Sequence, residues 1–385
     1  MIKKALWIGS IGFILGSLLS GCGADAGDAM RVEAPPSVNP NDPVKIEESD
    51  LYRLQGDILY VQNSETGLNI IDVKNLEQPK LLGQAPVVGK AGELYLRSGH
   101  AVVLLESATG ACQQPADCYV GSWGYGSEIV MVDLKALQSP RVIARYCLPG
   151  SLVASRAVND FLFVVTSEGS RSQVLSLDIT DPARTRVVQQ MDLSSSSKEI
   201  HVTEKAIFIA GPTYKSVDDP CPDGWCSGWG ENTEVKYVEI NATSGAMKAR
   251  GSVVVAGETQ GRFHMQAYED QFRIVTFAGS HSVLHVIDVE NPDQLGRIGS
   301  LGGIGSGEQL YATRFDGDRA YVVTFRQTDP LWVIDLSDPS RPQIVGELHV
   351  PGWSDFIFPR GDKLLCVGRG DGGWGLGVSL FDVSD

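Results

Sequence analysis

Six aspartates recur along this chain, each after an apolar run and before a turn-forming stretch. They are Asp72, Asp133, Asp178, Asp288, Asp335 and Asp382, and Glu239 fills the same place in a weaker copy. Carboxylates can act as general acids or as ligands for a hard cation. Their neighbours repeat with them, however, as in the phrases IIDVKNLEQP and VIDLSDPSRP. A residue that recurs once per repeat indicates a repeated structural role, which we expect to be acceptance of backbone N–H groups in the turn.

The spacing of this phrase predicts the fold. Successive copies lie 45 to 61 residues apart, and a hairpin with a Gly-Asp or Asn-Asp type turn precedes each one. Helical periodicity is almost absent, so we predict an all-β chain. A period in the forties with several short strands per unit is typical of a β-propeller. Seven hairpins and seven phrases predict seven four-stranded blades.

We expect the propeller to occupy residues 43–385. Its blades are predicted near residues 50–88, 92–148, 151–193, 198–255, 261–301, 307–350 and 353–385. The last blade stops after its third strand, and the stretch NDPVKIEE resembles the residues that come after the Asp phrase in other copies. Residues 43–48 are therefore predicted to close the ring as the outer strand of the last blade. The alternative is that the chain is a truncated form of a longer protein.

The first residues have the pattern of an export signal. Lys3 and Lys4 precede an apolar stretch that ends in LSGC at Cys22. This pattern resembles a bacterial lipoprotein signal, which implies removal of residues 1–21 and lipidation of the Cys22 thiol. A diacylated cysteine would hold the protein to a membrane. The alternative is an uncleaved membrane anchor.

Residues 22–42 are small, polar and rich in proline, and we predict that they form a flexible tether. Gly23 follows the cysteine where an aspartate could stand, which favours the outer membrane in a double-membraned bacterium. The formal net charge is −15, and loss of the two leader lysines would make it −17. Such an acidic chain is not expected to bind nucleic acid. We expect a monomeric propeller.

Two loops between the second and third strands of a blade each hold a pair of cysteines. The four residues are Cys112, Cys118, Cys221 and Cys226. Export makes disulfides possible, so each pair is predicted to close a small loop. Half of a metal site is the alternative, although no paired CxxC or nearby histidine supports zinc. Cys147 and Cys366 lie in apolar strand patterns and are expected to be buried free thiols.

The same two loops, residues 106–127 and 211–232, are long and carry aromatic residues, and the loop of the last blade adds another. The candidates are Trp123, Tyr125, Trp225, Trp229 and Trp374. Tryptophan favours burial or an interface, so these loops are candidates for recognising a carbohydrate or a protein. The alternative is that the aromatic side chains pack the long loops onto the propeller.

A second set of acidic residues lies near the start of the first strand of several blades. They are Glu93, Glu199, Glu258, Glu308 and Asp355. First strands line the channel of a propeller, so these carboxylates could ring its mouth and bind calcium through their oxygens. The alternative is a set of solvated acids at strand ends.

Residues 307–350, GEQLYATRFDGDRAYVVTFRQTDPLWVIDLSDPSRPQIVGELHV, closely resemble the secreted bacterial and archaeal β-propeller domain family, and they are similar to LVIVD-type repeats. The resemblance covers residues 50–385 and weakens in blades 2 to 4. It implies an exported propeller and supplies no catalytic residues. Because GxSxG and HExxH motifs are also missing, we expect a lipid-anchored binding or scaffolding module. The alternative is a hydrolase or lyase-type enzyme that uses the channel acids, with a metal.

Overall fold

The structure, a computed structural model, describes most of the chain as β-strands. The described residues are 6–8, 46–48, 50–97, 99–108, 126–217, 232–325, 329–350, 353–369 and 375–384. Within them the strands form seven antiparallel sheets. The chain divides into two compact units, residues 38–213 with 234–252, and residues 1–37 with 214–233 and 253–385. We call them the four-sheet unit and the three-sheet unit.

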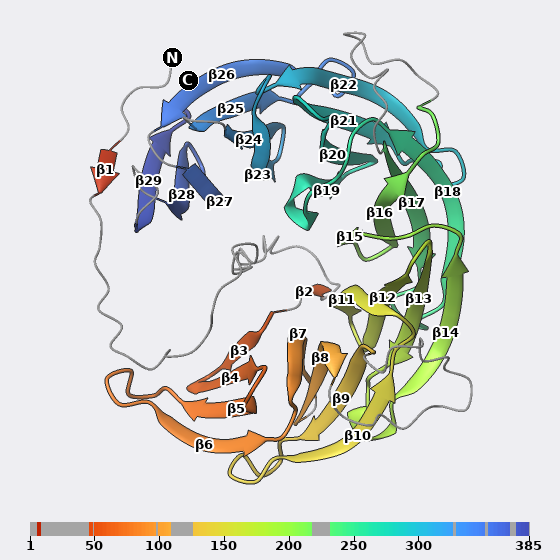
Figure 1. The fold of residues 1–385 in the computed structure, drawn as a ribbon, viewed down its shortest axis with the longest axis vertical. Helices are drawn as coiled ribbons and strands as arrows, with labels where there is room; N and C mark the ends of the chain where they lie inside the picture. The colour runs from red at the N-terminus through yellow and green to blue at the C-terminus, as the bar shows by residue number, and fades with distance from the viewer. Residues whose placement is uncertain are drawn as a thin grey trace. The chain divides into compact units, whose positions relative to one another are not determined.

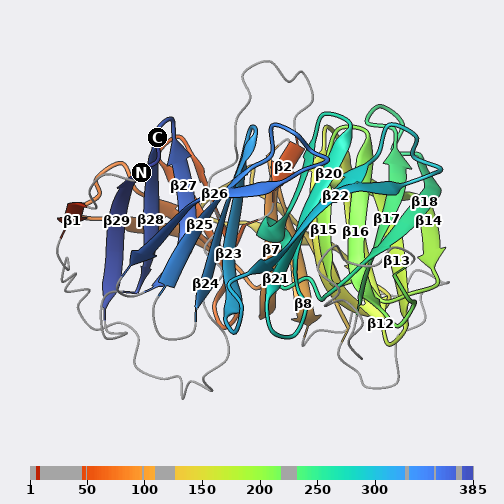
Figure 2. The ribbon, with the colours of Figure 1, turned by 90° about the horizontal axis from the view of Figure 1, so that it is seen from above.

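We number the seven sheets in chain order and call each one a blade, after the predicted repeat that it corresponds to. The four-sheet unit holds blades 1 to 4 (Figure 1). Blade 1 comprises β3 (Tyr52–Gln55), β4 (Ile58–Asn63), β5 (Gly67–Asp72) and β6 (Lys80–Ala85). Blade 2 comprises β7 (Gly89–Arg97), β8 (His100–Ala108), β9 (Glu128–Asp133) and β10 (Arg141–Cys147). Blade 3 comprises β11 (Ser151–Val158), β12 (Phe161–Glu168), β13 (Arg171–Asp178) and β14 (Arg186–Leu193), with the 3-10 turn η1 (Pro182–Arg184). Blade 4 comprises β15 (Glu199–Val202), β16 (Ala206–Thr213), β17 (Asn232–Ile240) and β18 (Met247–Val255), the last ending in the other unit; β16 to β18 lie side by side (Figure 2).

The three-sheet unit holds the remaining blades. Blade 5 comprises the 3-10 turn η2 (Arg262–His264), β19 (Met265–Tyr268), β20 (Gln271–Phe277), β21 (Ser282–Asp288) and β22 (Gly296–Ile304). Blade 6 comprises β23 (Gln309–Asp316), β24 (Arg319–Phe325), β25 (Asp329–Asp335) and β26 (Gln343–Val350). Blade 7 comprises β27 (Trp353–Arg360), β28 (Lys363–Arg369) and β29 (Leu376–Asp382). Within each sheet the strands of the hairpin and Asp phrases lie in chain order, as predicted, and two sheets carry one further strand that is out of chain order.

The recurring aspartates accept backbone N–H groups in the turn after the third strand, as predicted. Asp335 Oδ1, for example, accepts from Ser337 N at 2.9 Å. The other five make the same bond at 2.9 to 3.2 Å. In the weaker copy this role passes to Asn241, which accepts from Thr243 N at 3.0 Å, while Glu239 pairs with Arg250. The phrase is therefore a turn-stabilising device.

Apolar clusters fill the space between consecutive sheets within each unit. Tyr95, Val102 and Ile129 of blade 2 pack with Val164 and Leu175 of blade 3. Comparable clusters join blades 1 and 2, 3 and 4, 5 and 6, and 6 and 7. The third strands β9 and β21 are buried on both faces because neighbouring sheets cover them, which explains their continuous apolar runs.

The predicted role of residues 43–48 is wrong in its pairing. Ile46–Glu48 form the short strand β2, which pairs antiparallel with Arg156–Val158 of β11 rather than with blade 7 (Figure 1). The outer neighbour of β29 is β1 (Leu6–Ile8). An edge strand such as β11 has backbone N–H and C=O groups without partners in its own sheet, and any extended segment can form hydrogen bonds with them.

Candidate functional site

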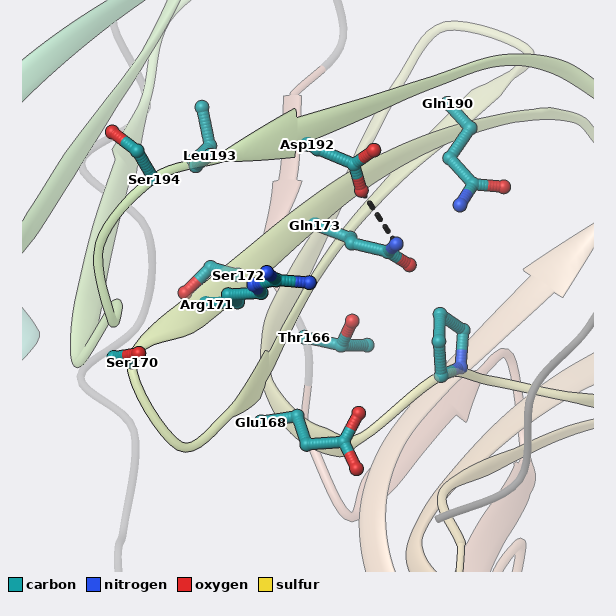
Figure 3. A pocket seen from close by; sticks show the side chains of 11 residues that line it. Thr166, Glu168, Ser170, Arg171, Ser172, Gln173, Gln190, Asp192, Leu193 and Ser194 are labelled. Carbon is teal, nitrogen blue, oxygen red and sulfur yellow. Dashed lines mark hydrogen bonds between the residues drawn. The ribbon is translucent and has the colours of Figure 1, made fainter.

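Blade 3 carries a hollow of about 810 Å³ at the end of the sheet where β12 turns into β13 (Figure 3). The turn is short, because β12 ends at Glu168 and β13 begins at Arg171. The side chains of Thr166, Gln173 and Asp192 come from three adjacent strands and are cross-strand neighbours in the register of the sheet. They therefore form one polar row across the wall of the hollow.

The hollow opens where one face of blade 3 changes from apolar to polar. Side chains on one face of a strand alternate with those on the other, so Val164 and Thr166 share a face, as do Leu175 and Gln173. Val164 and Leu175 pack against blade 2. Two positions nearer the turn, the same face of the sheet carries the polar residues Thr166 and Gln173. The apolar contact with blade 2, which excludes water, therefore ends there. The local sequence thus creates the opening.

The polar row is partly organised in advance. Gln173 Nε2 donates a hydrogen bond to Asp192 Oδ1 at 2.6 Å, which fixes the amide between two strands. Gln173 Oε1 is buried and has no hydrogen-bond partner among the described residues. Buried acceptors are normally satisfied, so a turn of the amide that brings this oxygen to the hollow would give a ligand an unused acceptor. Arg171 and Glu168, both exposed, add a cation and an anion at its rim.

The side chains that line the hollow are suited to hydrogen-bonding a ligand. The described lining residues include amides, hydroxyls, two carboxylates and one guanidinium, and no histidine, cysteine or lysine. Such a set supplies alternating donors and acceptors with little net charge. It therefore fits a polar, roughly neutral ligand.

In blades 2 and 4 the two long loops begin and end at the corresponding end of the sheet, where the second strand leads into the third. Blade 2 leaves it at Ala108 and returns at Glu128, and blade 4 leaves it at Thr213 and returns at Asn232. The predicted aromatic and cysteine residues of these loops, and Trp374, lie outside the described residues. They are Trp123, Tyr125, Trp225, Trp229, Cys112, Cys118, Cys221 and Cys226. They remain predictions, as does lipidation at Cys22, which also lies outside the described part.

Of the two strand cysteines, one follows the prediction. Cys366 is a buried free thiol. Cys147 is buried but disulfide-bonded, and its partner is not among the described residues. The free-thiol expectation for Cys147 is therefore wrong.

The predicted acidic residues occupy different kinds of place. Glu93 and Glu199 are buried and lie in the same register of their hairpins, each four residues before the hairpin turn. Glu258 forms an isolated backbone bridge with Phe277. Glu308 accepts from the Thr324 hydroxyl at 2.5 Å. Asp355 lies in β27 at a register shift between Ser354 and Phe356, one residue before the position that Glu93 and Glu199 occupy, and its side chain is not described.

Glu93 belongs to a buried network between blades 2 and 3. Its carboxylate accepts from Ser155 N at 3.0 Å and from the Ser155 hydroxyl, and Arg156 Nη1 lies 3.9 Å away. The Tyr95 hydroxyl lies 2.9 Å from Ser155 Oγ, and burial, reinforced by the Glu93 charge, raises the pKa of that phenol. Within the described residues, no group of three or more histidine, cysteine, aspartate or glutamate side chains is placed to hold a metal ion.

A second buried pair was missed by the sequence reasoning. His264 Nδ1 and Thr313 Oγ1 lie 2.7 Å apart between blades 5 and 6, and burial lowers the pKa of His264 to about 4. Beside them is a small pocket of about 50 Å³ lined by Phe263, Tyr311 and Phe356. His264 occupies the hairpin register that Glu93 occupies in blade 2. Aligning the hairpins by their turns would have marked both positions.

Residues 40–174 and residues 167–385 each match the family model described as Beta propeller domain. The two matches together cover most of the chain. This chain belongs to the beta propeller domain family. The seven sheets and the absence of long helices among the described residues agree with that membership. In that part of the chain, no helix has the length and hydropathy needed to cross a membrane.

Two relatives of this propeller are named as uncharacterized proteins. It is 39% identical over 154 residues to an uncharacterized protein of Archaeoglobus fulgidus, a match that covers 40% of this chain and 24% of the relative. It is 32% identical over 216 residues to an uncharacterized protein of Methanocaldococcus jannaschii, covering 52% and 33%. The matches thus span 24% to 33% of the length of these relatives.

Among solved structures, a functionally unknown protein from Desulfotomaculum acetoxidans is similar with a TM-score of 0.45 and 13% sequence identity. The match covers 83% of the propeller and 97% of that chain.

Proposed function

We propose that this propeller is an exported, lipid-anchored binding module with seven blades in a ring. The lipoprotein-like leader ending at Cys22 supports the anchor, and the seven sheets with their repeated register support the ring. Its ligand surface is the edge of the four-sheet unit that carries the blade 3 hollow. The observation that carries this proposal is the polar row of Thr166, Gln173 and Asp192 at the place where the apolar seal between two blades ends.

The ligand class that the hollow fits best is a carbohydrate. Hydroxyl groups of a sugar both donate and accept, and the row offers an amide, a carboxylate and a hydroxyl in fixed register. Gln173 Oε1 supplies an unused acceptor. The aromatic residues Trp123 and Tyr125, which the sequence places in the adjacent loop of blade 2, would add stacking surfaces for sugar rings.

The test is a glycan array probed with the full chain, followed by titration of the glycans that are retained. We expect Gln173→Ala and Trp123→Ala to weaken binding at least tenfold. Gln138→Ala, an exposed glutamine in a turn of blade 2, is the matched control and should leave binding unchanged. Absence of glycan binding, or equal binding by all three variants, would refute the carbohydrate proposal. Capture of a protein from envelope extracts through the same residues would replace it by a protein-binding role.

A further inference from the structure

A short N-terminal strand is attached to the edge of blade 3, apart from the hollow. Ile46–Glu48 pair antiparallel with Arg156–Val158, near the hairpin turn of the blade. The chain then crosses to blade 2, where Asp50 forms an isolated bridge with Leu94, and it continues into β3. The strand is thus held on β11 by three residue pairs.

The contact has the features of peptide recognition by strand addition. Backbone pairing supplies affinity, and alternate side chains supply specificity. Ile46 packs against the apolar cluster that contains Val158 and Val165. Glu47 Oε2 lies 2.6 Å from Arg97 Nη1, and both side chains are largely buried, at 18% and 11% exposure. The edge of β11 therefore favours an extended segment in which an aliphatic residue is followed by an acidic one.

The acceptor side of the contact is held in place by the blades themselves. Arg97 Nη1 donates to Leu96 O at 2.8 Å and Nη2 to Asn159 O at 3.4 Å. These bonds orient the guanidinium independently of Glu47, and a planar guanidinium is well suited to a carboxylate. The edge is thus a formed site, and the N-terminal strand is a short occupant of it.

We propose that the edge of β11, with Arg97 beside it, binds an extended acidic segment of another protein, and that Ile46–Glu48 occupy this site from within the chain until they are displaced. The inference does not depend on the carbohydrate proposal, since it uses different residues. A strand of three residues belongs to the least stable end of a structure, where local opening occurs well before global unfolding. Displacement by a competing strand is therefore compatible with an intact propeller.

A peptide with the sequence VKIEESD, residues 44–50, is the probe. In the full chain, Ile46→Asp combined with Glu47→Lys should release the internal strand, because it places a charge in an apolar contact and a cation beside Arg97. We expect this release variant to bind the labelled peptide at least tenfold more tightly than wild type, in which the linked strand competes at high effective concentration.

Charge exchange gives the matched control. In a chain that carries Ile46→Asp and keeps Glu47, Arg97→Glu places two carboxylates together and holds the linked strand off the site. That variant should not bind VKIEESD and should bind VKIKESD. Binding that ignores the charge at position 97, or no binding by a folded release variant, overturns the proposal.

Hydrogen exchange on the wild-type chain provides a test that does not depend on any variant. The amides of residues 46–48 should exchange at least a hundredfold faster than those of the interior strand β12. Addition of excess VKIEESD should accelerate their exchange further, since the peptide traps the open state. Protection of residues 46–48 equal to that of β12 would show that the strand is a permanent part of the blade and would refute the proposal.

Discussion

Glu93 of blade 2 accepts two hydrogen bonds from Ser155 of blade 3, one from its backbone N–H and one from its hydroxyl. His264 of blade 5 makes the corresponding contact with the hydroxyl of Thr313 in blade 6. Glu93 and His264 lie four residues before the end of their hairpin strands, and Ser155 and Thr313 lie three before. A polar contact at the same register therefore joins the first strands of blades 2 and 3 and the first strands of blades 5 and 6.

Removal of the Glu93 carboxylate should destabilise the four-sheet unit. Glu93→Ala leaves Arg156, itself buried, without its nearby anion, and we expect a loss of about 3 kcal/mol in the free energy of unfolding. Ser155→Ala leaves two buried oxygens without their shared partner and should cost about 1–3 kcal/mol. Urea unfolding measures both, with the exposed Glu65→Ala as control.

The double variant Glu93→Ala with Ser155→Ala shows whether the two side chains stabilise the protein through their mutual hydrogen bonds or only through the volume that each fills. Because Glu93 and Ser155 are bonded, their effects should be less than additive by at least about 0.5 kcal/mol. Strict additivity would contradict the view that the two residues act as one bridge between blades.

Two buried histidines should make the protein sensitive to mild acid. Burial lowers the pKa of His264 to about 4; burial, with the charge of Arg297, lowers that of His285 to about 3. The unfolded chain takes up these protons near pH 6.5, so between pH 6.5 and 4 the unfolded state binds more protons than the folded state. Stability is therefore full above pH 6.5 and falls as the pH decreases, by at most about 1.4 kcal/mol per pH unit for each histidine.

Urea midpoints measured between pH 5 and 6.5 test this expectation. The double variant His264→Gln with His285→Gln should flatten the slope, whereas His201→Gln, at a half-buried site, should retain most of it. An unchanged slope in the double variant would assign the acid sensitivity to other groups.

Gly299 should be intolerant of a side chain. It lies on β22, and a methyl group added there would approach Pro339 O, in the turn of blade 6, to 2.1 Å. A backbone oxygen cannot move aside without shifting the turn, so we expect Gly299→Ala to cost about 1–3 kcal/mol. Gly296→Ala on the same strand meets no atom within 4 Å and should change the thermal midpoint little. Equal effects of the two substitutions would argue against close packing at Gly299.

Cys22 should determine where the protein resides. Cys22→Ala is expected to move the protein from the membrane fraction to the soluble fraction and to remove the mass of its acyl chains. Cys366→Ala, which removes a buried thiol, is the control and should leave fractionation unchanged. Retention of Cys22→Ala in membranes would favour an uncleaved anchor, whereas an unmodified wild-type mass would exclude lipidation.

Much of the fold was predictable because it depends on local chemistry that repeats. The turn role of Asp335 and its counterparts follows from short-range hydrogen bonds that each phrase makes within itself. The burial of the third strands β9 and β21 follows from their continuous apolar runs.

The sites were less predictable because they depend on residues that are distant in the sequence. Glu93 looked like one of several equivalent acids, but the neighbouring sheet gives it Ser155 and Arg156 as partners. The hollow was not expected on blade 3, whose short turn gave no signal; it exists because Thr166 and Gln173 interrupt a seal that blade 2 completes.

The sequence alone therefore determined the type of strand, the turns and the number of repeats, since these follow from periodicity and turn chemistry within some fifty residues. The tertiary structure decided which edge receives Ile46–Glu48. An acidic extended segment can pair with many strand edges. The position of Arg97, set by its bonds to Leu96 O and Asn159 O, and the apolar cluster that receives Ile46 direct this segment to blade 3.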